Sequence, residues 1–211
     1  MNRNTIAAIV VMALMPVLAG AQVKKCNYAY SCGDKKATIV WTEKNMGDKT
    51  SIAIEYDWQK TYQEISNTDR TNVMWHIVNK AKGSDFTVRL EGKTYKVSGI
   101  LKGKPVSKTY QSKGLPWIEC LPYSAQYIFK DGVKTIKYES VNPGNAELTT
   151  VSASISDDTV TINGKKAKKV TLSAAGGLWK CYYFVNTDTK EFIQYRGTEG
   201  IHVPETVWTL K

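Results

Sequence analysis

Hydrophobic and polar residues alternate along several stretches of the chain. Phe86, Val88 and Leu90 alternate with polar neighbours, and the stretches 52–62 and 73–77 show the same period of two. In a β-strand this period places the apolar side chains on one face and the polar ones on the other, as in an antiparallel sheet with one buried face. The pattern therefore predicts a mainly β protein.

Turn-forming dipeptides separate the predicted strands. Asp131-Gly132 and Asn163-Gly164 each stand between two apolar runs, the first of them following Tyr127-Ile128-Phe129. Such dipeptides supply the positive φ angles of type I′ hairpin turns. We therefore expect roughly ten strands joined mainly by short turns.

One segment does not fit the strand pattern. Leu115, Ile118 and Leu121 recur every three residues, and Pro116 suits the first turn of a helix. Pro122 would then end that helix after one or two turns. The sequence predicts a short helical segment from Leu115 to Leu121.

The first residues have the pattern of a secretory signal peptide. A short basic start precedes an apolar run from Ile6 to Leu18 and the small residues Ala19-Gly20-Ala21. Thirteen helical residues span about 20 Å, less than the roughly 30 Å of a bilayer core, although an uncleaved anchor is the alternative. We expect cleavage after about Ala21, which leaves one β-rich domain over residues 22–211.

The predicted destination is the periplasm or the medium. A lipid anchor would need a cysteine directly after Leu18-Ala19-Gly20, where the chain has Ala21. No later apolar run reaches 18 residues, so we expect no membrane-spanning segment. The sequence does not indicate an oligomeric state.

The mature chain is basic but poor in arginine. Removal of Arg3 with the leader leaves 28 of the 29 basic residues against 19 acidic ones, a net charge of +9. Only three arginines remain: Arg70, Arg89 and Arg196. Nucleic-acid sites usually depend on the planar fork of arginine, so no nucleic-acid partner is expected. The net charge still allows a general attraction to anionic lipid or polysaccharide.

Four cysteines remain after export: Cys26, Cys32, Cys120 and Cys181. An oxidising compartment favours disulfides, and four cysteines allow three pairings. Cys26–Cys32 is the local choice, a Cys120–Cys181 bridge would close a longer loop, and free buried thiols are the alternative. The spacing and the presence of only two histidines match no structural zinc pattern, so neither a metal nor a cofactor is expected.

Catalytic motifs are not found in the sequence. Neither His76 nor His202 lies in a nucleophile motif, and no glycine-rich loop has the spacing that cradles phosphate. A pair of carboxylates that meet in space could still hydrolyse a glycoside. The sequence therefore favours a non-enzymatic protein and leaves an exported hydrolase as the least favoured alternative.

The second half of the chain resembles a known group. The motifs are Gly114-Leu115-Pro116-Trp117, Gln126-Tyr127, Asn163-Gly164-Lys165, Trp179–Phe184 and Phe192–Gly197. In this order they resemble an uncharacterised family of exported bacterial β proteins, akin to the periplasmic lipoprotein carriers LolA and LolB, over about half the chain. The resemblance implies a strongly curved antiparallel sheet or open half-barrel, with Leu115–Leu121 as a helical lid over its apolar concave face.

Aromatic residues supply the candidate binding site. The chain has 12 Tyr, 6 Trp and 4 Phe. Most such residues build the core of a β protein, but some can line a cleft. For a carrier of a lipid or acyl chain, we predict that the wall residues are Trp117, Tyr127, Trp179, Tyr183 and Phe184. The alternative is an interaction or glycan-binding protein of the envelope, with exposed coplanar aromatics near Trp58 and Tyr62.

Overall fold

The computed structural model describes residues 22–129, 132–174, 179–198 and 204–211. The predicted signal peptide, Asp131 and His202 lie outside these ranges. Within them the chain forms fourteen strands and one short helix. The elements are β1 (Val23–Cys32), β2 (Lys35–Asn45), β3 (Lys49–Tyr56), β4 (Gln59–Ser66), β5 (Asn72–Asn79), β6 (Ser84–Glu91), β7 (Thr94–Leu101), β8 (Lys104–Gln111), α1 (Leu121–Ile128), β9 (Thr135–Val141), β10 (Leu148–Ile162), β11 (Lys165–Ala174), β12 (Trp179–Asn186), β13 (Phe192–Gly197) and β14 (Thr206–Leu210).

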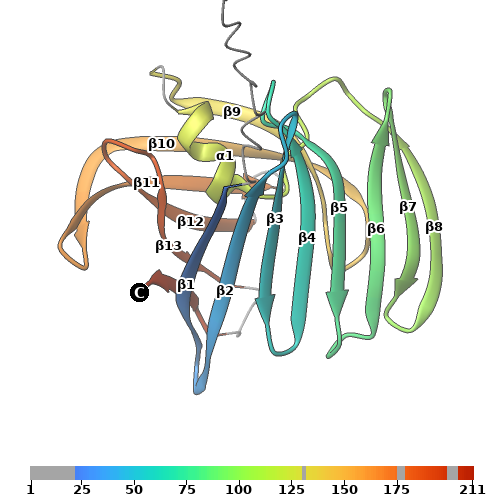
Figure 1. Cartoon of the computed structure of the whole chain (residues 1–211), viewed down its shortest axis with the longest axis horizontal. Coiled ribbons are helices and arrows are strands. Elements are labelled where there is room, and N and C mark those ends of the chain that lie inside the picture. Colours follow the sequence, from blue (N-terminus) through green and yellow to red (C-terminus); the bar gives the residue numbers. More distant parts are fainter. Residues whose placement is uncertain (1–21, 130–131, 175–178, 199–203) are drawn as a thin grey trace, which may run out of the picture.

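All fourteen strands belong to one antiparallel sheet. Its order runs from β8 through β7, β6, β5, β4, β3 and β2 to β1, then from β14 through β13, β12, β11 and β10 to β9. Strands β1 to β8 form an upright wall in Figure 1, β9 to β13 cross behind it, and α1 lies at the top between the two parts. The predicted mainly β fold with a strongly curved, open sheet is confirmed.

The two halves of the sheet are joined by a short extended segment. Trp117 forms a parallel bridge with Glu139 of β9. Its carbonyl oxygen accepts a hydrogen bond of 2.8 Å from the Asn72 amide at the start of β5. The backbone amide of Ile118 donates to the carbonyl oxygen of Glu139 (3.0 Å), and the backbone amide of Glu139 donates to the carbonyl oxygen of Pro116 (2.8 Å). We call residues 116–119 the seam, since backbone hydrogen bonds there connect β5 with β9.

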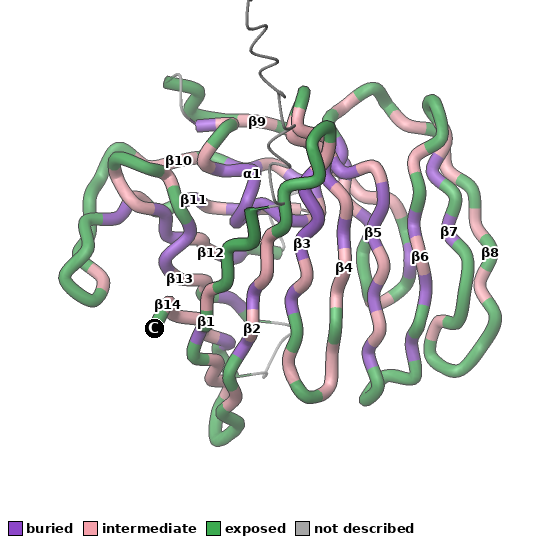
Figure 2. The backbone as a smooth tube through the Cα atoms, in the orientation of Figure 1, coloured by how far each residue is buried: buried purple, intermediate pink, exposed green. Residues whose placement is uncertain are grey.

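The concave face of the sheet is filled by apolar side chains. One cluster lies between α1 and β9–β12, a second lines β1–β4 and includes Phe192, and a third joins β5–β7 to the seam. Buried positions recur along the wall strands and gather around α1 (Figure 2). The largest fully buried side chains include Trp117, Tyr95, Phe86, Ile39, Ile52 and Ile65. The interior is therefore a packed core.

The hairpin turns agree in part with the sequence pattern. Asn163 and Gly164, with φ of 49° and 75°, join β10 to β11 as expected for a type I′ turn. The expected number of strands was too low, because alternation can run unbroken through a two-residue turn. Residues 52–62 predict one strand, but Tyr56 pairs with Gln59 across a turn at Asp57-Trp58.

The helical segment lies later than the sequence predicts. Residues 115–120 are extended or irregular, and α1 begins at Leu121 with Pro122 in its first turn. The first helical N–H groups have no partner within a helix, so proline begins this helix instead of ending it. The expected strand at Tyr127-Ile128-Phe129 is wrong for the same reason, because these residues form the end of α1 and its C-cap.

None of the four cysteines forms a disulfide in the structure. Cys26 and Cys32 lie six residues apart on β1, about 20 Å at the rise of a strand, whereas bridged Cα atoms lie within about 7 Å. The local pairing is therefore wrong. Cys120 and Cys181 are buried thiols, and burial raises the pKa of Cys181 to about 12.

Helices that could cross a membrane are not found in the described part of the chain. Its only helix there, α1, has eight residues.

Candidate functional site

A groove of about 440 Å³ lies beside α1, near the upper ends of β1 to β4. This volume is within the range of sites that bind small molecules. The residues that line it come from four separate parts of the chain: Gln22 and Lys24; Glu43, Asn45, Gly47 and Thr50; Asn67 and Arg70; Tyr123 and Tyr127. Most of these side chains are polar, so the groove suits a ligand with polar groups.

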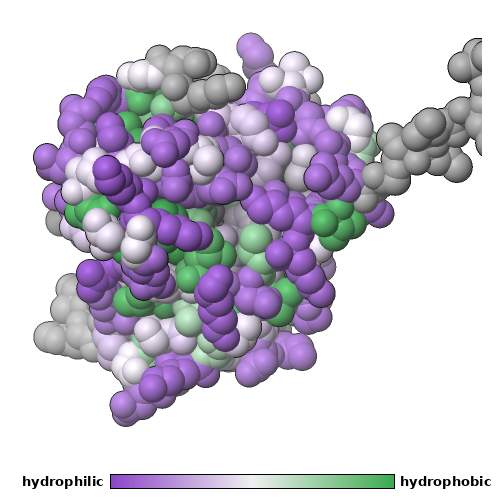
Figure 3. Space-filling view, turned by 60° about the vertical axis from the view of Figure 1, so that its left-hand side comes forward, coloured by the Kyte–Doolittle hydropathy of each residue, from purple (hydrophilic) through white to green (hydrophobic). Residues whose placement is uncertain are grey.

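A smaller apolar slot of about 100 Å³ adjoins the groove. The two share Lys24, Glu43 and Tyr123. The slot is also lined by Cys26, Tyr28, Trp41, Pro122, Gln126, Glu191, Phe192 and Leu210. Figure 3, which turns the left side of the molecule forward, shows apolar side chains gathered in a recess between hydrophilic ones.

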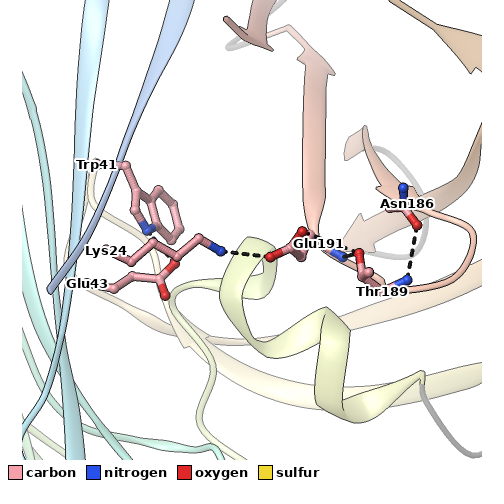
Figure 4. Close-up of polar contacts among 6 residues, drawn as sticks. All are labelled: Lys24, Trp41, Glu43, Asn186, Thr189 and Glu191. Atoms are coloured by element: carbon pink, nitrogen blue, oxygen red, sulfur yellow. Dashed lines mark hydrogen bonds and ion pairs between the residues drawn. The ribbon is translucent and has the colours of Figure 1, made fainter. Parts of the chain in front are cut away.

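An ion pair crosses the slot between β1 and the residue that precedes β13. Lys24 Nζ of β1 lies 2.8 Å from Glu191 Oε1, just before β13 (Figure 4). Burial alone would lower the pKa of Lys24, but the hydrogen bond to Glu191 and the nearby Glu43 charge raise it. The same bond lowers the pKa of Glu191. Glu43 accepts a hydrogen bond of 2.7 Å from Trp41 Nε1. Lys24 is thus held by carboxylates of the site itself.

A closed ring of hydrogen bonds holds the other end of the groove. Arg70 Nη1 donates to Asn67 Oδ1 (2.8 Å) and to the Tyr123 hydroxyl (3.1 Å). Tyr123 donates to Thr50 Oγ1 (3.2 Å), and Thr50 donates to Asn67 Oδ1 (2.8 Å). Thr50 and Tyr123 are buried. The ring connects α1, β3 and the β4–β5 loop, and it fixes the position of the guanidinium.

The Arg70 guanidinium also lies over an aromatic ring. Its Cζ is 4.0 Å from the centroid of Tyr127, within the range of a cation–π contact. Partial burial and the neighbouring Tyr123 hydroxyl raise the pKa of Tyr127 to about 12, so its hydroxyl is neutral at physiological pH. Among the described residues, Arg70 has no carboxylate partner, and its Nε and Nη2 donate to no side chain or backbone group.

Two loops of the same conformation border the groove and the slot. In the β4–β5 loop, the Arg70 amide donates to the Ser66 carbonyl and Arg70 has a φ of 61°. In the β12–β13 loop, the Lys190 amide donates to the Asn186 carbonyl and Lys190 has a φ of 58°. This left-handed conformation favours glycine, so each loop holds a long basic side chain at an unfavourable backbone position.

Of the predicted site residues, only Tyr127 lines the groove. Tyr183 packs against Phe192 of the slot, with ring centroids 5.8 Å apart. Trp117 is buried in the seam, and Trp179 is exposed at the start of β12. Phe184 lies in a small separate cluster with Ala167 and Ile193. The structure thus places the five predicted residues in different surroundings.

The sequence did not indicate the polar residues of the groove, because each is unremarkable alone. Lys24, Glu43 and Arg70 are separated by long stretches and meet only through the sheet. The only sequence signal is the low arginine content, which makes a half-buried arginine unusual in this chain.

The geometry expected for the alternative functions is different from that observed. The ring of Trp58 is inclined by 74° to that of Tyr56 and by 71° to that of Tyr30, so these rings are not coplanar. Tyr62 pairs with Ala53, so its side chain lies on the opposite face of the sheet from Ile54 and Tyr56. The carboxylates that line the groove and the slot are Glu43 and Glu191, and Lys24 interacts with both of their charges. Within the described ranges, no group of three or more His, Cys, Asp or Glu residues could hold a metal ion.

Two glutamates, the half-buried Glu119 and the fully buried Glu139, lie at the seam, away from the groove. Glu119 accepts hydrogen bonds from Trp117 Nε1 (2.6 Å), the Val141 amide (2.6 Å) and Ser140 Oγ (2.8 Å). Burial raises the pKa of Glu119 to about 7, against the opposing effect of these donors. The fully buried Glu139 accepts from Tyr95, Ser112 and the Lys113 amide. These contacts fix the seam.

Comparison with known proteins identifies a similar fold but no function. No protein-family model and no curated protein matches the chain. The chain is similar to the crystal structure of a β-barrel-like protein of the domain of unknown function DUF1849 from Brucella abortus. The TM-score is 0.61 at 11% identity, covering 90% of this chain and 96% of that one. The similarity supports a β-barrel-like fold, and it does not confirm the resemblance to LolA and LolB.

Proposed function

We propose that this protein is an exported, non-enzymatic binding module that holds a small amphipathic ligand in the groove beside α1. The observation that carries the proposal is the junction of a polar groove of about 440 Å³ with an aromatic slot of about 100 Å³. A polar part of the ligand would lie among Lys24, Glu43 and Arg70, and an apolar part would lie against Trp41 and Phe192.

The volumes of the groove and the slot limit the size of the ligand. A lipid or long acyl chain was the first expectation, but the concave face is packed by buried side chains. The slot has room for roughly three water-sized groups by volume. A carrier of this geometry therefore takes a short apolar group, and any longer chain would have to extend out through the groove.

Non-enzymatic binding is supported by the chemistry of the groove. Glu191 bonds to Lys24, which lowers its pKa and keeps it ionised, so it lacks the raised pKa of a general acid. Export, the second part of the proposal, rests on the leader-like sequence of residues 1–21. Cell fractionation and N-terminal sequencing test it, with the mature chain expected to begin at about Gln22.

A blocking substitution tests the groove as a binding site. The half-buried Gln126 of α1 lines the slot, so Gln126→Trp should fill it. The control is Gln111→Trp on the exposed edge strand β8. Native mass spectrometry of protein purified from the cell envelope should show a bound small molecule in the wild type and in the control but not in Gln126→Trp. An equal yield of ligand from all three proteins would contradict this location.

A further inference from the structure

We propose that the ligand of the groove carries a carboxylate, which Arg70 binds through Nε and Nη2, next to a short apolar group that enters the slot. This inference rests on the proposed function and adds the chemical class of the ligand. It also assigns Arg70 as the residue that recognises the charged group.

The first argument is the hydrogen bonding of the guanidinium. Both of its side-chain bonds use Nη1, to Asn67 and Tyr123. Nε and Nη2 have no partner among the described residues, and together they form the two-donor edge that matches the two oxygens of a carboxylate. Since Arg70 lines the groove, a ligand there can supply the missing anion.

The second argument is that Arg70 is held in place before any ligand binds. The ring through Asn67, Thr50 and Tyr123 fixes Nη1, and Tyr127 supports one face of the guanidinium. The backbone of Arg70 keeps a left-handed φ of 61°, where glycine would be less strained. Strained positions that persist are often part of a binding site, because the surrounding contacts determine them.

The charges around the groove favour a carboxylate over a phosphate dianion. Lys24 is already paired with Glu191 and lies near Glu43, so it offers little free positive charge. Arg70 is then the one cation of the lining without an ionic partner among the described residues. A single guanidinium neutralises one charge, and Glu43 would repel a second.

The slot defines the apolar part of the ligand. Its aromatic walls come from Tyr28, Trp41 and Phe192, and its volume suits a chain of a few carbons. Hexanoate is a suitable probe, because its carboxylate can lie at Arg70 while part of its chain reaches the slot. Hexanol, hexylamine and hexyl phosphate have the same number of carbon atoms and carry a different head group.

Titration followed by amide chemical shifts in two-dimensional NMR tests the inference on the whole mature chain. Hexanoate should shift signals of the β4–β5 loop, α1 and β2, and it should bind at least about tenfold more tightly than hexanol or hexylamine. Hexyl phosphate should bind less tightly than hexanoate. Tighter binding of hexyl phosphate would overturn the choice of a carboxylate and indicate a phosphate ligand.

Two substitutions of Arg70 distinguish the role of its guanidinium in binding from an effect on the fold. Arg70→Gly removes the side chain and relaxes the left-handed backbone, and it should weaken hexanoate binding by about ten- to hundredfold without changing the affinity for hexanol. Arg70→Lys keeps the charge but loses the fork, so it should bind with intermediate affinity. Lys190→Gly, the same backbone change in the β12–β13 loop, should leave binding unchanged.

The outcomes distinguish the two proposals. If hexanoate and hexanol shift the same groove signals with equal affinity, the groove is a binding site but the carboxylate inference is wrong. The inference is also wrong if Arg70→Gly binds hexanoate as the wild type does. If none of the four probes shifts groove signals, and native mass spectrometry finds no bound ligand, both the inference and the proposed function are overturned.

Discussion

Arg70 and Lys190 occupy equivalent positions in two hairpin loops, and both have positive φ angles. A side chain with a Cβ atom is strained in this conformation, whereas glycine is not. A third loop of this kind has Ala146 with a φ of 55°. Ala146 is fully buried in the apolar cluster that joins β5–β7 to the seam, called the seam cluster below. Each of these residues is thus present although its backbone conformation is strained, but only Arg70 lines the groove.

The first prediction concerns the stability of these loops. Lys190→Gly should raise the free energy of unfolding by roughly 0.5–1 kcal/mol, because glycine removes the left-handed strain. Arg70→Gly should change it by less than about 0.5 kcal/mol, because the same gain offsets the lost bonds to Asn67 and Tyr123 and the lost contact with Tyr127. Urea denaturation at neutral pH measures both. A large loss of stability in Lys190→Gly would contradict the strain argument.

The second prediction concerns the buried carboxyl of Glu119. Its pKa of about 7 in the folded chain lies above the ordinary value of 4.5, so the folded state binds the proton more tightly than the unfolded state does. This contribution to stability is present below about pH 4.5 and is lost as the pH rises through about 7. The loss amounts to about 3 kcal/mol at most.

Glu119→Gln should remove this pH dependence. The amide oxygen can accept from Trp117 and Val141, and its nitrogen can donate to Ser140 Oγ. Urea denaturation between pH 5 and pH 8 should show the variant gaining stability relative to the wild type as the pH rises. A constant difference across this range would mean that Glu119 does not change its protonation state there.

At the scale of the element, α1 depends on packing more than on its own sequence. It has eight residues, no side-chain N-cap, no acid in its first turn and no base in its last. A helix this short is marginal in water. Leu121, Ala125 and Phe129 bury one side of it against β9–β12, and Tyr123 binds it to the groove. Tertiary contacts therefore position the wall of the site.

The third prediction follows from this dependence. Leu121→Ala should cost about 2–4 kcal/mol, because the truncated side chain leaves a cavity between α1 and the sheet. It should also weaken binding at the groove, since Tyr123 and Tyr127 lie on the same helix. The matched control, Gln126→Ala on the half-buried face, should change stability by less than about 0.5 kcal/mol. Thermal and urea unfolding measure both, and equal losses would contradict the proposed role of Leu121.

The sequence pattern predicted elements better than their ends. Alternation identified strands such as β6, because one face of this sheet is buried along most of its length. It did not separate β3 from β4, since the apolar spacing continues through the turn at Asp57-Trp58. The position of α1 was wrong because Pro122 can begin a helix as well as end one. The groove could not be predicted, because its residues meet only through strand pairing and the docking of α1.

At the scale of the whole molecule, the order of strands leaves β8 and β9 at the two ends of the sheet. Side chains and the seam nevertheless join the two halves. The Tyr110 hydroxyl of β8 donates to the Ala146 carbonyl, and Tyr95 of β7 donates to Glu139 of β9. Trp117 packs edge-on against Tyr95, with ring centroids 5.2 Å apart. The curved sheet is therefore closed by packing and side-chain bonds where strand pairing stops.

The fourth prediction is that this closure can open without global unfolding. Glu139→Ala leaves the buried Tyr95 hydroxyl and the partly buried donors of Ser112 and Lys113 without their acceptor, and a buried group left unsatisfied costs about 1–3 kcal/mol. Native-state hydrogen exchange should show the amides of β6–β8 losing protection, because β5–β8 contact the second half mainly through the seam cluster. The amides of β2 and β3 should lose less, since they lie in the central part of the sheet.

The exposed Ser98 of β7 supplies the control, and Ser98→Ala should leave the exchange pattern unchanged. A uniform loss of protection across all strands in Glu139→Ala would instead show that the sheet and its seam unfold as one cooperative unit.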